Sequence, residues 1–140
     1  MGKRGTYTIH IGGEDRSGRF SLGFWELLQE EYGEPAGFLM SFLDQITPKE
    51  LISLVYCSLK YDALANRKTF PYTRYEVAEW IEEVQAEDGG EEAISEVVSA
   101  FLDSRQVGKM IEAAEKIVAE IEAQKGKQAN PEEIKKKQGN

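Results

Sequence analysis

Residues 6–33, TYTIHIGGEDRSGRFSLGFWELLQEEYG, change their hydrophobic period halfway along the segment. Over Thr6–Ile11 every second residue is apolar, which is the pattern of a half-buried β-strand. The run Gly12–Asp15 is rich in turn residues, and Arg16–Phe20 predicts a second, more polar strand. The first half of the segment therefore predicts a β-hairpin over residues 6–20.

The second half of the same segment predicts a helix. Ser21 is suited to the N-cap position, and Gly33 to the left-handed residue that follows a helix. Between them, apolar residues recur at helical spacing: Phe24, Trp25, Leu28 and Tyr32. Because a two-stranded hairpin is only marginally stable by itself, we expect this helix to serve as its floor.

Helix start signals recur along the rest of the chain. Pro35 suits a first helical turn, and Thr47–Glu50 and Thr73–Glu76 each match the capping box that opens a helix. The apolar stripes that follow these signals supply a core: Phe38, Leu39, Phe42, Leu43, Ile46, Leu51, Ile52, Val55, Leu59, Val77, Trp80, Ile81, Val84, Ile94, Val97, Val98, Phe101 and Leu102. The sequence predicts a mainly α fold, a compact multi-helix domain with a short N-terminal β-hairpin.

The length of 140 residues fits a single domain, which we place at residues 1–124. Its parts include the hairpin at 6–20 and an amphipathic last helix at about 105–124. Residues 125–140 are polar and contain few apolar side chains, so they predict a disordered tail.

The chain is acidic. Its 17 Lys and Arg residues against 25 Asp and Glu residues give a net charge of −8, which opposes binding to nucleic acid and to anionic membranes. We therefore expect the partner to be a protein, and we expect the chain to bind neither nucleic acid nor a membrane. Cys57 is the single cysteine and can form no internal disulfide, no apolar run would span a bilayer, and no signal peptide opens the chain. These features predict a cytoplasmic protein.

The last predicted helix carries an apolar seam. It consists of Val107, Met110, Ile111, Ala114, Val118 and Ile121, with Ile117 alongside. Two interpretations remain open. Either the seam packs on the domain's own core, or it pairs with a partner helix or with a second copy of the chain.

The sequence offers no catalytic constellation. His10 is the only histidine, and its strand places it towards solvent without a second ligand for a metal. The pair Gly12 and Gly13 lacks the lysine and further glycines of a phosphate-binding loop. Adjacent acidic residues such as Glu82 and Glu83 point to different sides of a helix. We expect no enzyme activity, no cofactor and no metal site.

Aromatic residues fall into two groups. Those at helical spacings favour the core: Phe24, Trp25, Tyr32, Phe38, Phe42, Trp80 and Phe101. The others surround an irregular loop, and of these Phe70, Tyr72 and Tyr75 are candidates for partner binding. The alternative for this loop is an aromatic pocket for a small molecule or a substrate.

The order of these motifs resembles the tail assembly chaperones of long-tailed, siphovirus-like bacteriophages and prophages. The resemblance rests on YTIHIGG at 7–13, FSLGFWELLQEEYG at 20–33, LISLVYCSLKYDAL at 51–64, YTRYEVAEWIEEV at 72–84 and ISEVVSAFLDS at 94–104. It implies a helical protein with a small β-element that binds the tape measure protein and keeps it soluble in the bacterial host cytoplasm. Such a protein helps the tail tube to assemble and is absent from the mature virion.

The resemblance implies further partners. Many members of that family are also made in a longer form by ribosomal frameshifting, and the added domain is thought to recruit the tail tube protein. Gly126–Lys127 and Lys135–Lys137 are amino acids that a slippery site would encode, although a Lys-rich end is more often a solubilising tail. Coating a long partner favours several copies, so a homo-oligomer is a further expectation. The alternative to a chaperone is a structural phage tail component or connector.

Overall fold

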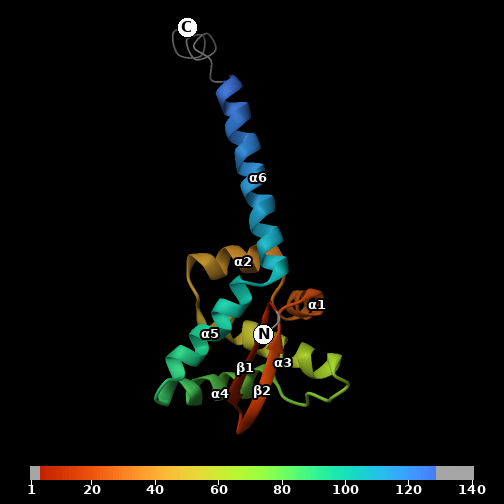
Figure 1. Ribbon diagram of the computed structural model, residues 1–140, viewed down its shortest axis with the longest axis vertical. Helices are drawn as coiled ribbons and strands as arrows, with labels where there is room; N and C mark the ends of the chain where they lie inside the picture. The colour runs from red at the N-terminus through yellow and green to blue at the C-terminus, as the bar shows by residue number, and fades with distance from the viewer. Residues whose placement is uncertain (1–3, 129–140) are drawn as a thin grey trace. The chain divides into compact units, whose positions relative to one another are not determined.

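The hairpin pairs β1 (Thr6–Ile11) with β2 (Glu14–Arg19) in an antiparallel two-stranded sheet (Figure 1). The computed structural model describes residues 4–128. The apolar residues of β1 are buried, whereas Thr8 and His10 between them are exposed. The predicted alternation is thereby confirmed.

A two-residue turn joins the strands and sets their register. Gly12 and Gly13 have positive φ angles of 64° and 85°, as the central residues of a type I′ turn require. Ile11 pairs directly with Glu14. The second strand therefore begins before the expected Arg16, because the turn uses the two glycines alone and leaves Glu14 to the strand.

Six helices follow in the described residues, so the fold is mainly α with an N-terminal hairpin, as predicted. They are α1 (Leu22–Glu31), α2 (Pro35–Asp44), α3 (Pro48–Ala65), α4 (Arg74–Ala86), α5 (Gly90–Leu102) and α6 (Arg105–Gln128). The predicted helix starts at Pro35 and after Thr47 and Thr73 are confirmed.

Side-chain caps open two of the helices. The Glu76 amide donates to Thr73 Oγ1 at 3.2 Å, and the Thr73 amide donates to Glu76 Oε1 at 2.9 Å. In the second capping box the Thr47 amide donates to Glu50 Oε1 at 3.1 Å. Ser21 occupies the N-cap of α1, but its buried hydroxyl has no hydrogen-bond partner within the described residues. The N-cap position was thus predicted correctly, whereas the capping bond does not form.

Glu50 also ties the end of α1 to the start of α3. Its carboxylate accepts a hydrogen bond from the Tyr32 hydroxyl, and its side chain is buried. Burial by itself would raise the pKa of Glu50, but hydrogen bonds from Thr47 and Tyr32 outweigh this and leave the pKa below its ordinary value. The ionised carboxylate therefore links the two helices.

An aromatic cluster forms the centre of the core, and Phe101 of α5 lies in its middle. Its ring contacts Phe20, Phe24, Trp25, Phe38 and Phe42, at centroid distances of 5.0 to 6.1 Å. Most of these contacts are edge-to-face, the geometry that aromatic quadrupoles prefer. The expected core assignment is confirmed for Phe24, Trp25, Phe38, Phe42 and Phe101, which are all buried. Tyr32 was also expected in the core but is only half-buried.

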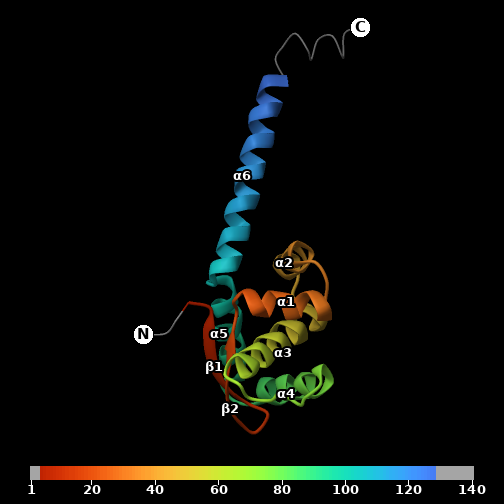
Figure 2. The same cartoon turned by 90° about the vertical axis from the view of Figure 1, so that its right-hand side faces the viewer.

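Helix α3 lies between α1 and α4, and β2 packs against it (Figure 2). A buried hydrogen bond of 2.7 Å joins the Tyr7 hydroxyl on β1 to Ser58 Oγ on α3. Burial raises the pKa of Tyr7 far above its ordinary value, so the phenol stays neutral. The hairpin is therefore held to the central helix by a polar contact as well as by apolar packing.

The chain divides into two compact units after Gly108. The first contains the hairpin, the helices α1 to α5 and the first residues of α6, where Val107 is fully buried. The second begins at Lys109 and contains the rest of α6. A single domain over residues 1–124 stays a prediction.

The last helix is longer than expected. Instead of ending at about residue 124, α6 continues through Gly126 to Gln128. A glycine inside a helix costs about 1 kcal/mol relative to alanine, so one glycine among good helix formers such as Lys and Gln does not end the helix. Residues 129–140, most of the predicted tail, lie outside the described residues. Within residues 4–128, no helix combines the length and the apolar character that crossing a membrane requires.

An alanine at Gly12 should destabilise the protein more than an alanine at Gly13. A Cβ on Gly12 would lie 2.7 Å from the Trp80 ring, whereas nothing lies within 4 Å of a Cβ on Gly13. Both variants carry the strain of positive φ, about 1–2 kcal/mol, and the clash should cost Gly12→Ala a further 1–3 kcal/mol, roughly. Urea denaturation followed by circular dichroism measures both free energies of unfolding. Equal losses would contradict the packing of the turn on Trp80.

Candidate functional site

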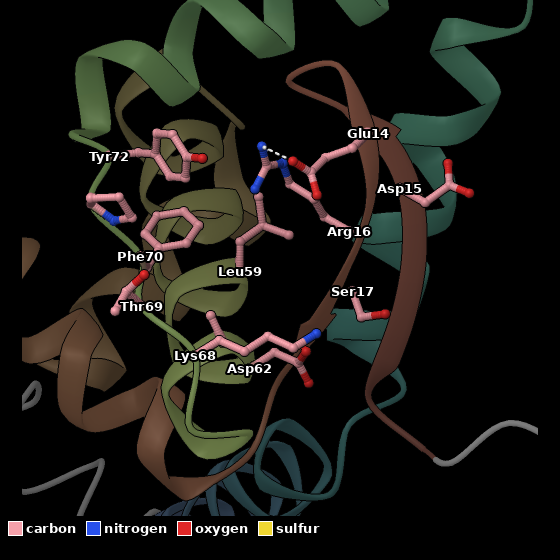
Figure 3. A pocket seen from close by; sticks show the side chains of 12 residues that line it. Glu14, Asp15, Arg16, Ser17, Leu59, Asp62, Lys68, Thr69, Phe70 and Tyr72 are labelled. Atoms are coloured by element: carbon pink, nitrogen blue, oxygen red, sulfur yellow. Dashed lines mark hydrogen bonds and ion pairs between the residues drawn. The ribbon is translucent and has the colours of Figure 1, made fainter.

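A cleft of about 320 Å³ opens between β2, the end of α3 and the loop that leads to α4 (Figure 3). Its polar lining consists of Glu14, Asp15, Arg16, Ser17, Asp62, Lys68 and Thr69, and Leu59, Ala63, Phe70, Pro71 and Tyr72 complete it. Charges of both signs line the cleft, so the lining selects neither an anion nor a cation.

Arg16 forms one wall of this cleft and ties the hairpin to α4. Its Nε donates to the Ile11 carbonyl at 2.9 Å, and its Nη2 donates to the Gly12 carbonyl at 3.2 Å. The guanidinium lies 4.5 Å from the centroid of Trp80 and 4.9 Å from that of Tyr72. These partners hold Arg16 in place, so its role in the cleft is structural.

Phe70 and Tyr72 lie together in the loop before α4, with ring centroids 5.1 Å apart. Both also pack on other rings, Phe70 on Tyr56 at 5.9 Å and Tyr72 on Trp80 at 4.9 Å. Trp80 was expected in the core but is only half-buried, because the hairpin turn covers its ring only in part. Tyr75 is 77% exposed. Much of the surface of Phe70 and Tyr72 is therefore covered by neighbouring rings, whereas the Tyr75 side chain is accessible to a partner.

In the part of the chain that the structure describes, no three His, Cys, Asp or Glu side chains lie close enough together to bind a metal ion. His10 is exposed, and its Nδ1 lies 2.8 Å from Asp15 Oδ1. The strand register accounts for this pair, because it places the two residues directly opposite each other. The contact is therefore a cross-strand pair on the surface of the hairpin.

The thiol of Cys57 is a packing group. The residue lies on α3 and is 0% exposed. Burial raises the pKa of the thiol to about 12, and the negative charge of Glu31 contributes in the same direction. A thiol that does not ionise at neutral pH is a poor nucleophile.

Cys57 should resist Ellman's reagent in the native protein at pH 8 and react fully in urea, because only the unfolded chain exposes a thiol that ionises readily. The raised pKa of the Cys57 thiol also predicts that the free energy of unfolding falls in alkali. The unfolded thiol ionises near its ordinary value of 9.0 and the folded one only near 12, so this contribution is present below pH 9 and lost as the pH rises towards 12. A native thiol that reacts as fast as free cysteine would contradict the burial.

The apolar seam of α6 lies in two different environments. Val107 is fully buried in the first unit and belongs to its core, and Met110 is half-buried. The remaining members are exposed: Ile111 at 36%, Val118 at 52%, Ile121 at 48%, Ala114, and also Ile117 at 55%. We call these five residues the α6 face. Four of them were sequence-predicted site residues, and the helix brings them onto one side of the second unit.

Other exposed apolar residues were not predicted as a site. Leu43, Ile46 and Leu102, which were expected in the core, are 55%, 45% and 40% exposed, and Met40 is 72% exposed. On α2 only the side that carries Phe38 is buried. The signal was present in the sequence, because α2 is apolar nearly all round and a short surface helix can bury only one side.

Comparison with protein-family models, with curated proteins and with solved structures finds no match for this chain. The candidate surfaces are therefore weighed by their geometry. The cleft is polar, mixed in charge and walled by a structural arginine, whereas the α6 face is apolar and continuous. The α6 face is the stronger candidate for a binding surface, since an exposed apolar patch usually marks an interaction site.

Proposed function

We propose that the protein is a tail assembly chaperone of a siphovirus-like bacteriophage or prophage. It binds the tape measure protein in the bacterial host cytoplasm, keeps it soluble and helps the tail tube to assemble, and it is absent from the mature virion. The observation that carries the proposal is the exposed α6 face of the second unit. The order of motifs over residues 6–104 supports the same family.

The α6 face suits a helical partner. Apolar residues spaced by three and four positions are the anchors by which one amphipathic helix binds another. A tape measure protein of the proposed class is long and helical, and it exposes such surfaces until tube subunits close around it. Uncovered apolar surface of this kind leads to aggregation, so a bound helix would keep the partner in solution.

The acidic surface supports the same role. Because of its net charge of −8, the chain repels other free copies of itself and the nucleic acid of the host. On α4 and α5 the outward-facing glutamates include Glu79, Glu82, Glu83, Glu91, Glu92 and Glu96, all exposed. Copies bound along one long partner would therefore make the whole complex acidic and soluble.

The proposal includes the tail tube protein as a second partner, reached through a frameshifted longer form. The lysines Lys135–Lys137 that would mark the slippery site lie outside the described residues. The helix α6 is described as far as Gln128. Sequence added after the frameshift would therefore follow this helix and leave the hairpin and α1 to α5 unchanged.

Co-expression should raise the soluble fraction of the tape measure protein of the same phage, because the α6 face would cover apolar surface that otherwise aggregates. Soluble and pelleted fractions on gels measure this. The double substitution Ile111→Lys with Val118→Lys should abolish the gain while the helix content by circular dichroism is retained, since both residues are exposed.

The matched control is Ala86→Lys with Ala123→Lys, which adds the same charge at exposed positions away from the α6 face and should keep the gain. Unchanged solubility together with no co-purification at low salt would refute the chaperone proposal.

Purified virions should lack the protein, since a chaperone leaves before the tail is complete. Mass spectrometry of particles, compared with a lysate of infected cells in which the chain is abundant, makes this measurement. Its presence in virions at a fixed number of copies would instead identify a structural tail component or connector.

A further inference from the structure

The α6 face is acidic along one edge only. With about 100° between successive residues of a helix, Glu115 and Glu122 project about 40–60° to one side of Val118. Gln124 projects beyond the opposite edge, and Lys116 lies on the back of the helix. A partner helix lying on the α6 face would therefore meet carboxylates along one side and a neutral border along the other.

Among the side chains that the structure describes, residues 4–125, no ion pair involves either of these two carboxylates. Both are exposed. The residues three and four positions from Glu115 include no cation, and Lys125, three positions after Glu122, makes no ion pair with it. The negative charge of this edge is consequently available to a second molecule.

A second copy of the chain complements this face poorly. In a parallel pair of α6 helices, Glu115 and Glu122 would lie beside Met110 and Ile117 of the other copy, placing charge against apolar side chains. In an antiparallel pair the two acidic edges would lie side by side and repel each other. Ala114 in the middle of the seam would also leave little apolar contact between two identical helices.

We propose that the α6 face binds an amphipathic partner helix that carries Lys or Arg along one edge of its apolar stripe. The basic side chains pair with Glu115 and Glu122, and the apolar residues pack on Ile111, Val118 and Ile121. Ala114 accepts a large apolar side chain of the partner, because a small residue leaves room for one. The inference rests on the proposed function in one respect: the partner helix would belong to the tape measure protein.

Two synthetic helices serve as probes for the full chain. Each has about three heptads with a leucine seam, one with Lys along a single edge of the seam and one with Glu at the same positions. Fluorescence anisotropy at low and at physiological salt measures their affinities. The basic probe should bind more tightly than the acidic probe, and this preference should shrink as salt screens the charges.

Charge reversal tests the edge itself. Glu115→Lys with Glu122→Lys should weaken binding of the basic probe by about tenfold and strengthen that of the acidic probe. Glu82→Lys with Glu120→Lys changes the net charge equally, but neither residue lies three or four positions from Glu115 or Glu122, and this variant should leave both affinities within about twofold. Circular dichroism checks that both variants keep their helix content.

The proposal is overturned if both reversals weaken the basic probe equally, if the two probes bind alike, or if sedimentation shows a stable dimer that the substitution Val118→Lys dissociates. The last result would assign the α6 face to a second copy. Failure of the proposed function looks different, because the basic probe would bind as expected while the tape measure protein stayed insoluble in co-expression.

Discussion

The packing of Phe101 against rings from the first third of the chain is the constraint on which the first unit depends. Phe101 lies near the end of α5, whereas its neighbours belong to the residue after β2, to α1 and to α2. Each edge-to-face pair adds about 0.5–1.5 kcal/mol beyond the area it buries. The early segments therefore gain a complete core only when α5 has folded onto them, which makes the central contact non-local.

This dependence explains why a hairpin precedes a chain of helices. β1 contacts α4 and α5 while β2 contacts α3, so three helices support a sheet that would be marginal alone. The contacts are specific as well as apolar: Tyr7 bonds to Ser58, and Arg16 stacks on Trp80 beneath the glycine turn. The hairpin thus joins helices that are distant in sequence.

Local signals were enough to predict the hairpin, the helix starts and much of the core. The box of Thr73 and Glu76 forms because its hydrogen bonds join residues three apart, and a sequence displays such spacing directly. Burial was harder to predict, because it depends on which other element covers a face. Leu43 and Trp80 have helical core spacing, but α2 turns one outward and the hairpin turn only half covers the other. Hydrophobic periodicity predicts which residues share a face of a helix, but it does not predict which other element covers that face.

The apolar seam of α6 is a further case in which the sequence pattern does not predict burial. A single apolar pattern runs through it, yet Val107 is buried in the first unit and Val118, in the second, is exposed. Val107 therefore serves folding, and a change there acts on stability. The residues of the α6 face are exposed and contribute little to folding, so a change there should leave the free energy of unfolding nearly unchanged. The fold therefore tolerates changes on this face that it does not tolerate at Val107, whose side chain is fully buried.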